Sequence, residues 1–185
     1  MKVSQQCGVA ARKGYQLLGL ISRLFSCKKK SIIIKLYKSL VRPHLDYCVQ
    51  AWRPHLQKDI DVLERVQRRA TRMIDECKGM DYEERLRITG LTTLETRRLR
   101  ADLVEVYKIL NGIDKVDESK FFERYAVGAS ARGTCITRGN SLKLFQSRAR
   151  LDIAKYSFGN RVVKDWNHLT NEVVQGCSFI QRQTR

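Results

Sequence analysis

Apolar residues recur at intervals of three and four along most of the chain, a spacing that is typical of amphipathic helices. The clearest case is residues 56–76, for which the pattern predicts one long helix. At about 100° per residue, its apolar positions form one broad stripe, made of Leu63, Val66, Ala70, Met73 and Ile74. The opposite side carries arginines with helical spacing, namely Arg65, Arg68, Arg69 and Arg72. The segment therefore predicts a helix with one buried face and a row of guanidinium groups in water.

The same spacing predicts further helices on both sides of this segment. They cover residues 9–25 and 31–41, a short helix that ends at Gly90, and residues 93–110 and 157–169. Phe25 and Leu40 are expected on the buried sides of the first two. Pro43 is expected to kink the second helix rather than end it, because the apolar pattern continues beyond it. Residues 141–145 fit either a short strand or an extended segment.

This pattern predicts a mainly α-helical chain with three parts. Residues 1–112 form a helical region, and Asn111-Gly112 is expected to close its last helix. Residues 113–140 contain several glycines and few apolar anchors, which predicts a loop-rich linker around a short turn at Phe121-Phe122. Residues 141–185 are expected to form a small, loop-rich, basic C-terminal extension that includes a helix.

The positive net charge of the chain indicates a negatively charged partner. The chain has 36 Lys and Arg against 19 Asp and Glu among its 185 residues, a net charge of +17. The excess gathers in residues 12–58 and 124–164, where Asp46 and Asp152 are the only acidic residues. Such blocks favour a polyanion, with nucleic acid as the first expectation and an acidic membrane surface as the second. An ordinary solvated basic face remains the alternative interpretation of the arginine row.

Cysteine usage and the apolar runs predict an intracellular protein, in the cytoplasm, the nucleus or both. The six cysteines are scattered without a C-x-x-C pair, which is not typical of a disulfide framework. The N-terminal residues lack the apolar core of a signal peptide, and no apolar run is long enough for a membrane span.

The chain shows no motif of a catalytic, metal or cofactor site. His44 and Cys48 have the spacing of one ligand pair, but a structural zinc site needs two such pairs. There is no glycine-rich phosphate loop. There is also no adjacent pair of aspartates of the kind that two-metal polymerase chemistry requires. We therefore expect no cofactor, no metal and no catalytic residue in this chain.

The C-terminal block offers a second candidate surface. Its basic residues Arg138, Lys143, Arg148 and Arg150 are interleaved with the aromatic residues Phe145, Tyr156 and Phe158. This mixture suits phosphate contacts combined with base stacking. A half-buried basic surface has the same composition, so both interpretations stay open.

One long segment resembles a known family. Residues 36–74 read LYKSLVRPHLDYCVQAWRPHLQKDIDVLERVQRRATRMI, and residues 90–112 read GLTTLETRRLRADLVEVYKILNG. Both are similar to the region after the catalytic palm in reverse transcriptases of LINE-type (non-LTR) retrotransposons, of the chicken-repeat and jockey-like kind. The resemblance extends through TRGNSLKLFQSRARLDIAKYSFGNRVVKDWNHL and covers residues 3–174.

The resemblance implies a thumb-like helical bundle in residues 1–112, followed by the C-terminal extension that holds template–primer or element RNA. The endonuclease and the palm would lie upstream, outside this chain. The expected partner is RNA, DNA or an RNA–DNA hybrid, bound without sequence readout and without catalysis. Backbone contacts would come from Arg65, Arg68, Arg69, Arg72 and Lys28, Lys29 and Lys30, with Arg138, Lys143, Arg148 and Arg150 as a second patch.

Further expectations follow from the missing palm. Loss of its interface is expected to leave apolar surface uncovered and to favour self-association. The ending CSFIQRQTR departs from the family, which predicts a truncated end.

Two alternative functions remain: a part of an RNA-directed DNA polymerase that acts only together with the palm, and an inert or co-opted helical interaction module. A palm encoded upstream would favour the first, and a folded chain without nucleic-acid affinity the second.

Overall fold

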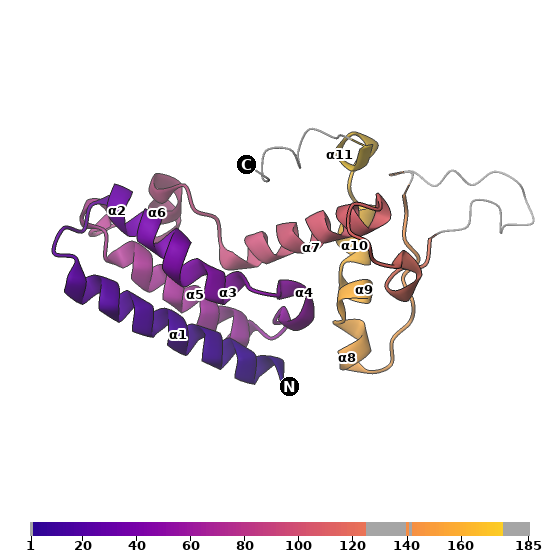
Figure 1. Cartoon of the computed structure of the whole chain (residues 1–185), viewed down its shortest axis with the longest axis horizontal. Coiled ribbons are helices and arrows are strands. Elements are labelled where there is room, and N and C mark those ends of the chain that lie inside the picture. The colour runs from indigo at the N-terminus through magenta and orange to yellow at the C-terminus, as the bar shows by residue number, and fades with distance from the viewer. Residues whose placement is uncertain (1, 125–139, 141, 176–185) are drawn as a thin grey trace, which may run out of the picture. The chain divides into compact units, whose positions relative to one another are not determined.

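The computed structural model describes residues 2–124, 140 and 142–175, and within them the chain is mainly helical (Figure 1). These residues contain no extended sheet, and only Arg124 and Leu144 form an isolated antiparallel bridge. The chain divides into two compact units, Met1–Arg98 and Leu99–Arg185. No helix among the described residues is both long and apolar enough to cross a membrane.

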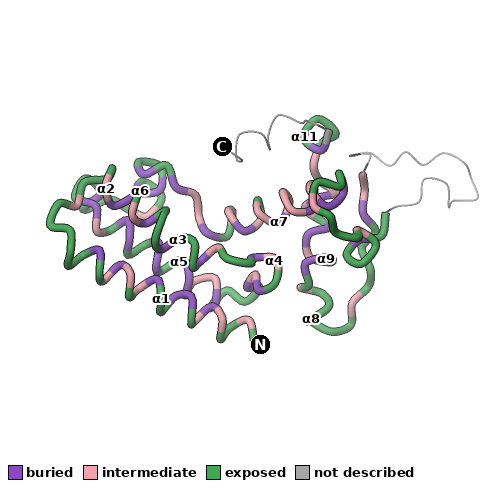
Figure 2. The backbone as a smooth tube through the Cα atoms, in the orientation of Figure 1, coloured by how far each residue is buried: buried purple, intermediate pink, exposed green. Residues whose placement is uncertain are grey.

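Unit 1 is a bundle of helices. Its elements are α1 (Val3–Leu24), α2 (Lys30–Leu36), the π-helical turn η1 (Tyr37–Val41), α3 (Arg42–Asp46), α4 (Val49–Trp52), α5 (Gln57–Arg72), η2 (Asp75–Cys77), α6 (Tyr82–Thr89) and the start of α7 (Leu94–Leu110). Buried positions recur along α1 and α5, alternating with exposed ones (Figure 2). The apolar stripe predicted for α5 is confirmed, because Leu63, Val66, Ala70 and Ile74 are buried and Met73 packs against the same core.

Helices α1 and α5 run side by side in the same direction. Near their N-terminal ends, Ser4 Oγ donates a hydrogen bond to Asp59 Oδ2 at 2.6 Å. Farther along both helices, Gly14 faces Val66 so closely that a Cβ at Gly14 would lie 2.8 Å from Val66 Cγ1. The missing side chain at Gly14 therefore sets the distance between the two helices.

The prediction that Pro43 does not end the second helix is confirmed, since helical structure continues from Lys30 to Asp46 through η1. Proline has no amide hydrogen to donate to the preceding turn. The widened turn accommodates this, and the Arg42 amide donates to the carbonyl of Tyr37, five residues back. The offset turns Leu40 outward, with 45% of the residue exposed, so its predicted burial was wrong.

A polar cluster lies inside unit 1 on a side of α5 that the sequence did not mark as buried. Glu64 is only 6% exposed. Its Oε1 accepts hydrogen bonds from the Tyr82 hydroxyl and from Gln67 Nε2, and its Oε2 accepts from the Leu94 amide at 2.9 Å. The Tyr37 hydroxyl donates to Gln67 Oε1 at 2.8 Å. Glu64 therefore satisfies an amide in the first turn of α7 while it connects α5 to α6.

Unit 2 contains the rest of α7, η3 (Glu118–Lys120), α8 (Asp152–Lys155), α9 (Phe158–Arg161), α10 (Val163–Asn167) and α11 (Asn171–Gln175). Its core is apolar and includes the four residues predicted inside the last helix, Phe158, Val162, Val163 and Trp166. The extended segment around Leu144 is held by a side chain: the Leu144 amide donates to Asn167 Oδ1 at 3.0 Å, and Asn167 Nδ2 donates to the Leu144 carbonyl at 2.9 Å. The extended alternative for residues 142–145 is confirmed.

Several boundaries differ from the predictions. Helix α1 begins at Val3 rather than near residue 9, and Phe25 lies beyond its end, with 37% exposed. The helix predicted over residues 157–169 is interrupted at Val162, and α8 and α11 were missed because neither has a full helical period of apolar residues. The unit boundary lies inside α7, not after Gly112, because Val106 and Leu110 of α7 belong to the core of unit 2.

The close approach at Gly14 predicts opposite effects for two glycines of the same helix. We expect Gly14→Ala to lower the free energy of unfolding by about 1–3 kcal/mol, because the stiff Val66 side chain must move. Gly19→Ala is the matched control, since nothing lies within 4 Å of its Cβ position. It should raise stability by up to about 1 kcal/mol through helix propensity. Urea unfolding of both variants checks this, and equal effects would contradict it.

Stability is expected to fall in alkaline solution. Burial, assisted by the charge of Asp59, raises the pKa of the Cys7 thiol from 9.0 to about 11. Above pH 9 the unfolded chain therefore loses this proton while the folded chain keeps it, so the thiol's contribution is complete below pH 9 and is lost as the pH rises through 11. Urea titrations at several pH values should show this decline, and Cys7→Ala should make it shallower. An unchanged slope in the variant would assign the decline to other groups.

Candidate nucleic-acid interface

The four arginines of the predicted row lie together on the exposed side of α5. Arg65, Arg68, Arg69 and Arg72 line a groove of about 530 Å³, and the remaining lining residue is Tyr15 of α1. The groove therefore has walls of guanidinium groups and one aromatic ring, with no acidic residue among them. The sequence prediction that these four residues share one face is confirmed.

Two tyrosines hold the central arginines in place. The guanidinium carbon of Arg68 lies 4.9 Å from the ring centre of Tyr82, and that of Arg69 lies 5.6 Å from the ring centre of Tyr15. Tyr82 is itself anchored by its hydroxyl, which donates to Glu64. Burial and this hydrogen bond raise the pKa of Tyr82, so its ring stays neutral well above physiological pH. Stacking on a fixed ring limits the motion of a guanidinium group and leaves its N–H edge open.

The four guanidinium groups form no ion pair with any carboxylate of the described residues. Like charges three and four positions apart on a helix cost about 0.2–0.5 kcal/mol per pair, and the row contains four such pairs, 65–68, 65–69, 68–72 and 69–72. Arg69 and Arg72 recover part of this cost near the C-terminal end of α5. The row is therefore a concentration of positive charge that the described part of the fold does not neutralise.

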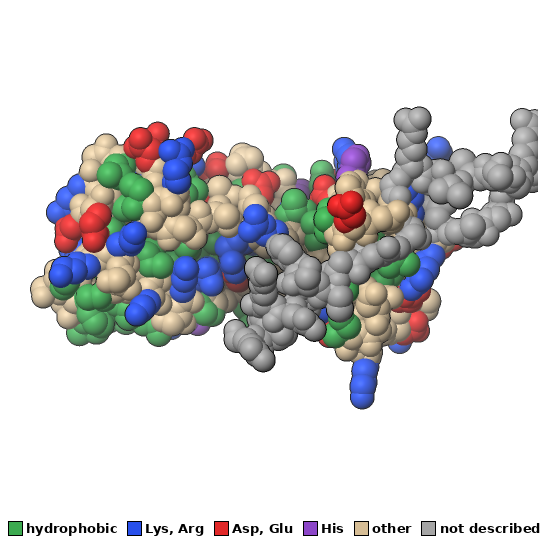
Figure 3. Space-filling model, turned by 90° about the horizontal axis from the view of Figure 1, so that it is seen from above, with side chains coloured by type: hydrophobic (Ala, Val, Ile, Leu, Met, Phe, Trp, Pro, Cys, Tyr) green, Lys and Arg blue, Asp and Glu red, His purple; other side chains and the backbone are tan. Residues whose placement is uncertain are grey.

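Elsewhere on unit 1, charges of both signs are mixed. Figure 3 shows a face on which Lys and Arg side chains are spread between apolar patches, with acidic side chains toward its edges. Asp46, isolated in the sequence, accepts hydrogen bonds from Arg97 Nε at 3.0 Å and from Nη2 at 2.8 Å. Burial lowers the pKa of neighbouring Arg98, which is 2% exposed and stacks on Trp52. These groups stabilise the fold rather than offering a surface.

Lys28 and Lys29 lie between α1 and α2, Lys30 is the first residue of α2, and none of the three lines the arginine groove. The backbone of Lys28 accepts a hydrogen bond from the Asp75 amide at 3.2 Å, just beyond the C-terminal end of α5. The Lys30 amide donates to Glu76, and its Nζ donates to the Ile88 carbonyl at 3.4 Å. These bonds place Lys28 and Lys30 near the end of α5, but the Lys30 ammonium group is already engaged in the fold.

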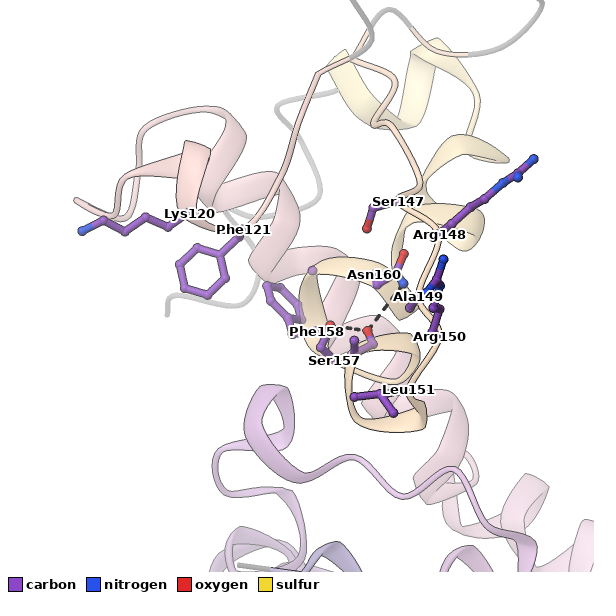
Figure 4. Close-up of a pocket in the computed structure, with 12 residues that line it drawn as sticks. Lys120, Phe121, Ser147, Arg148, Ala149, Arg150, Leu151, Ser157, Phe158 and Asn160 are labelled. Atoms are coloured by element: carbon purple, nitrogen blue, oxygen red, sulfur yellow. Dashed lines mark hydrogen bonds between the residues drawn. The ribbon is translucent and has the colours of Figure 1, made fainter.

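The second predicted patch is only partly assembled. Arg148 and Arg150 are exposed and line a pocket of unit 2 of about 540 Å³, together with Lys120 (Figure 4). Lys143 is half-buried on the extended segment and does not line the pocket. Arg138 lies outside the described residues. Of the interleaved aromatic residues, Phe158 belongs to the core and Phe145 is 45% exposed.

Arg161, also in the basic block, has a structural role. Its Nε and Nη2 each donate to the carboxylate of Asp102 at 3.0 Å, and Asp102 is fully buried. A two-bond pair of this kind is directional and joins α9 to α7. Sequence periodicity does not distinguish this arginine from its exposed neighbours, because its partner lies 59 positions earlier.

These sites also contain Tyr15, Tyr82 and Lys120, which were not predicted from the sequence. Each is distant in sequence from the arginines that it accompanies, so no local spacing identifies it. No group of three or more His, Cys, Asp or Glu among the described residues is arranged to hold a metal ion. Comparisons with family models, curated proteins and solved structures found no match to the chain.

Tyr82 permits a test that separates its hydroxyl from its ring. We expect Tyr82→Phe to lower stability by about 1–3 kcal/mol, because Glu64 loses a donor in a buried site. Arg68 should remain stacked on the phenyl ring. Tyr82→Leu should also release Arg68, which ¹⁵N relaxation of its Nε–Hε group would detect as increased motion. If Arg68 becomes equally mobile in both variants, the ring contact does not hold it.

Proposed function

We propose that this chain binds nucleic acid through its phosphate backbone, without sequence readout and without a catalytic step of its own. The observation that carries this proposal is the groove of four arginines, none of which pairs with a carboxylate of the described residues. Guanidinium groups bind phosphate oxygens through paired N–H donors. A groove built from four of them, with no acceptor side chain for base edges other than the Tyr15 hydroxyl, favours affinity over sequence specificity.

The dimensions of the row suit a nucleic-acid strand. Seven positions separate Arg65 from Arg72, which at about 1.5 Å per residue is roughly 10 Å along the helix axis. Each strand of a duplex advances about 3.4 Å per nucleotide. The row therefore spans about three nucleotides, so the four side chains can reach neighbouring phosphates of one strand.

The sequence resemblance supports a second proposal, which concerns the larger protein to which this chain corresponds. We propose that the chain corresponds to the thumb and C-terminal extension of a LINE-type reverse transcriptase, as the resemblance of residues 3–174 implies. The helical build of unit 1 and the position of the arginine row support this. In that setting the ligand would be template–primer or element RNA inside the cell, and the loop-rich basic C-terminal region would add contacts.

The salt dependence of binding tests the arginine groove. We expect log K for a 20-base-pair RNA–DNA hybrid to fall with log salt with a slope near −3.6, from about −0.9 per phosphate contact. Affinity should then decrease by about 10²-fold between 50 and 200 mM salt. The double variant Arg65→Gln/Arg72→Gln should flatten the slope by about 2. Both residues are exposed and neither stacks on a tyrosine, so the fold should be unaffected.

A matched pair removes the same charge elsewhere on unit 1. Lys38 and Arg87 are exposed and do not line the groove. Lys38→Gln/Arg87→Gln should leave the slope within about half a unit of the original protein. Equal losses in both pairs would mean that net charge alone drives binding and would overturn the assignment to the groove. A wild-type chain that binds no hybrid at 50 mM salt would overturn the proposed function itself.

A further inference from the structure

The pocket of unit 2 has a chemistry different from that of the arginine groove. Its volume is about 540 Å³, within the usual range for small-molecule sites. Lys120, Arg148 and Arg150 supply positive charge on its lining, and no acidic residue is among the lining residues. The pocket also contains aromatic carbon from Phe121 and Phe158 (Figure 4). An anion with an attached flat, apolar group would match both features.

The pocket also contains a side-chain amide oxygen that is available to accept a hydrogen bond. Asn160 lines it and is 8% exposed, and its Oδ1 is a buried atom with no hydrogen-bond partner among the described residues. Its Nδ2 is directed to the Ala154 carbonyl at 3.4 Å (Figure 4). That carbonyl already accepts a shorter bond, 2.8 Å, from Ser157 Oγ. A buried amide oxygen left without a donor costs stability, so a ligand with an N–H group would relieve it.

The position of Phe121 depends on Gly159. A Cβ at Gly159 would lie 2.5 Å from the carbonyl oxygen of Phe121, so only glycine allows this contact. The Phe121 ring meets Phe158 edge to face, with ring centres 6.2 Å apart at 71°. Phe121 nevertheless remains 44% exposed, whereas Phe158 is buried. The fold thus fixes an aromatic ring at the pocket and leaves part of it open for stacking.

We propose that this pocket binds one unpaired nucleotide of a single-stranded nucleic acid. The base stacks on Phe121, an exocyclic amino group donates to Asn160 Oδ1, and the phosphate is held by Arg148 and Arg150. Stacking on aromatic side chains and hydrogen bonds to base edges are how proteins hold unstacked bases. This assignment rests on the proposed function, since it supplies a base contact where the arginine groove supplies phosphate contacts.

Calorimetric titration of the full chain with 5′-AMP and with ribose 5-phosphate tests the pocket. The two probes share the sugar and the phosphate and differ by the base. We expect AMP to bind at least about fivefold more tightly, the lower end of what one stacked base contributes. Phe121→Leu and Asn160→Leu should each reduce AMP binding toward that of ribose 5-phosphate. Arg150→Gln should weaken both probes by similar factors.

Stability measurements separate a binding role of Asn160 from a structural one. If its oxygen awaits a ligand, Asn160→Leu should leave the midpoint of thermal unfolding unchanged or raised, because an unsatisfied acceptor is removed. A lowered midpoint with unchanged AMP affinity would overturn the proposal. So would equal affinities of the wild-type chain for the two probes. Phe121→Leu, at a partly exposed site, keeps the test valid if the Asn160 variant does not fold.

The failure of this inference is distinguishable from failure of the proposed function. Arg65→Gln/Arg72→Gln lies in unit 1 and should leave AMP binding unchanged while it weakens binding of the hybrid. A chain that prefers AMP over ribose 5-phosphate but binds no hybrid would support the pocket and contradict the groove. A chain that binds the hybrid with the expected salt slope but does not distinguish the two probes would support the groove alone.

Discussion

The buried carboxylate of Glu64 is the interaction on which unit 1 depends. It lies on α5 away from the arginine row, and its oxygens accept hydrogen bonds from Tyr82 of α6 and from the Leu94 amide at the start of α7. A buried charge is costly unless hydrogen bonds satisfy it. Here the donors come from two other helices and from Gln67, so the charge is stable only when α5, α6 and α7 meet in this arrangement. Rotation of α5 about its axis would break these bonds, and the arginine row is therefore held outward.

Tyr82 connects the buried hydrogen-bond cluster around Glu64 with the exposed arginine row. Its hydroxyl belongs to the buried cluster, whereas its ring centre lies 4.9 Å from the guanidinium carbon of Arg68 and 5.5 Å from that of Arg85. An exposed arginine on a helix normally samples many rotamers, and fixing one on binding costs free energy. A ring that is already fixed reduces that cost for Arg68. The same residue thus links the stability of the bundle to the readiness of the groove for an anion.

The sequence predicted those features that depend on one helix alone. The apolar stripe and the arginine row of α5 follow from periodicity, and Gly90 and Gly112 end their helices with positive φ as expected. Burial of Glu64 and Gln67 was not predictable, because their partners Leu94 and Tyr37 are 30 positions away. The pocket of unit 2 was missed for the same reason, since Lys120 and Arg148 come from separate segments. Periodicity shows which side of a helix is polar, but a polar side is exposed only if no other element covers it.

The arginine row and the pocket differ in the kind of partner that each lacks. The row lacks anions: four mutually repelling charges stand on one helix without a carboxylate from the described residues. The pocket lacks a donor, since Asn160 Oδ1 is buried and accepts no hydrogen bond from the described residues. A phosphate backbone would supply the first missing group and a base amino group the second, so the nucleic-acid ligand that we propose would satisfy both.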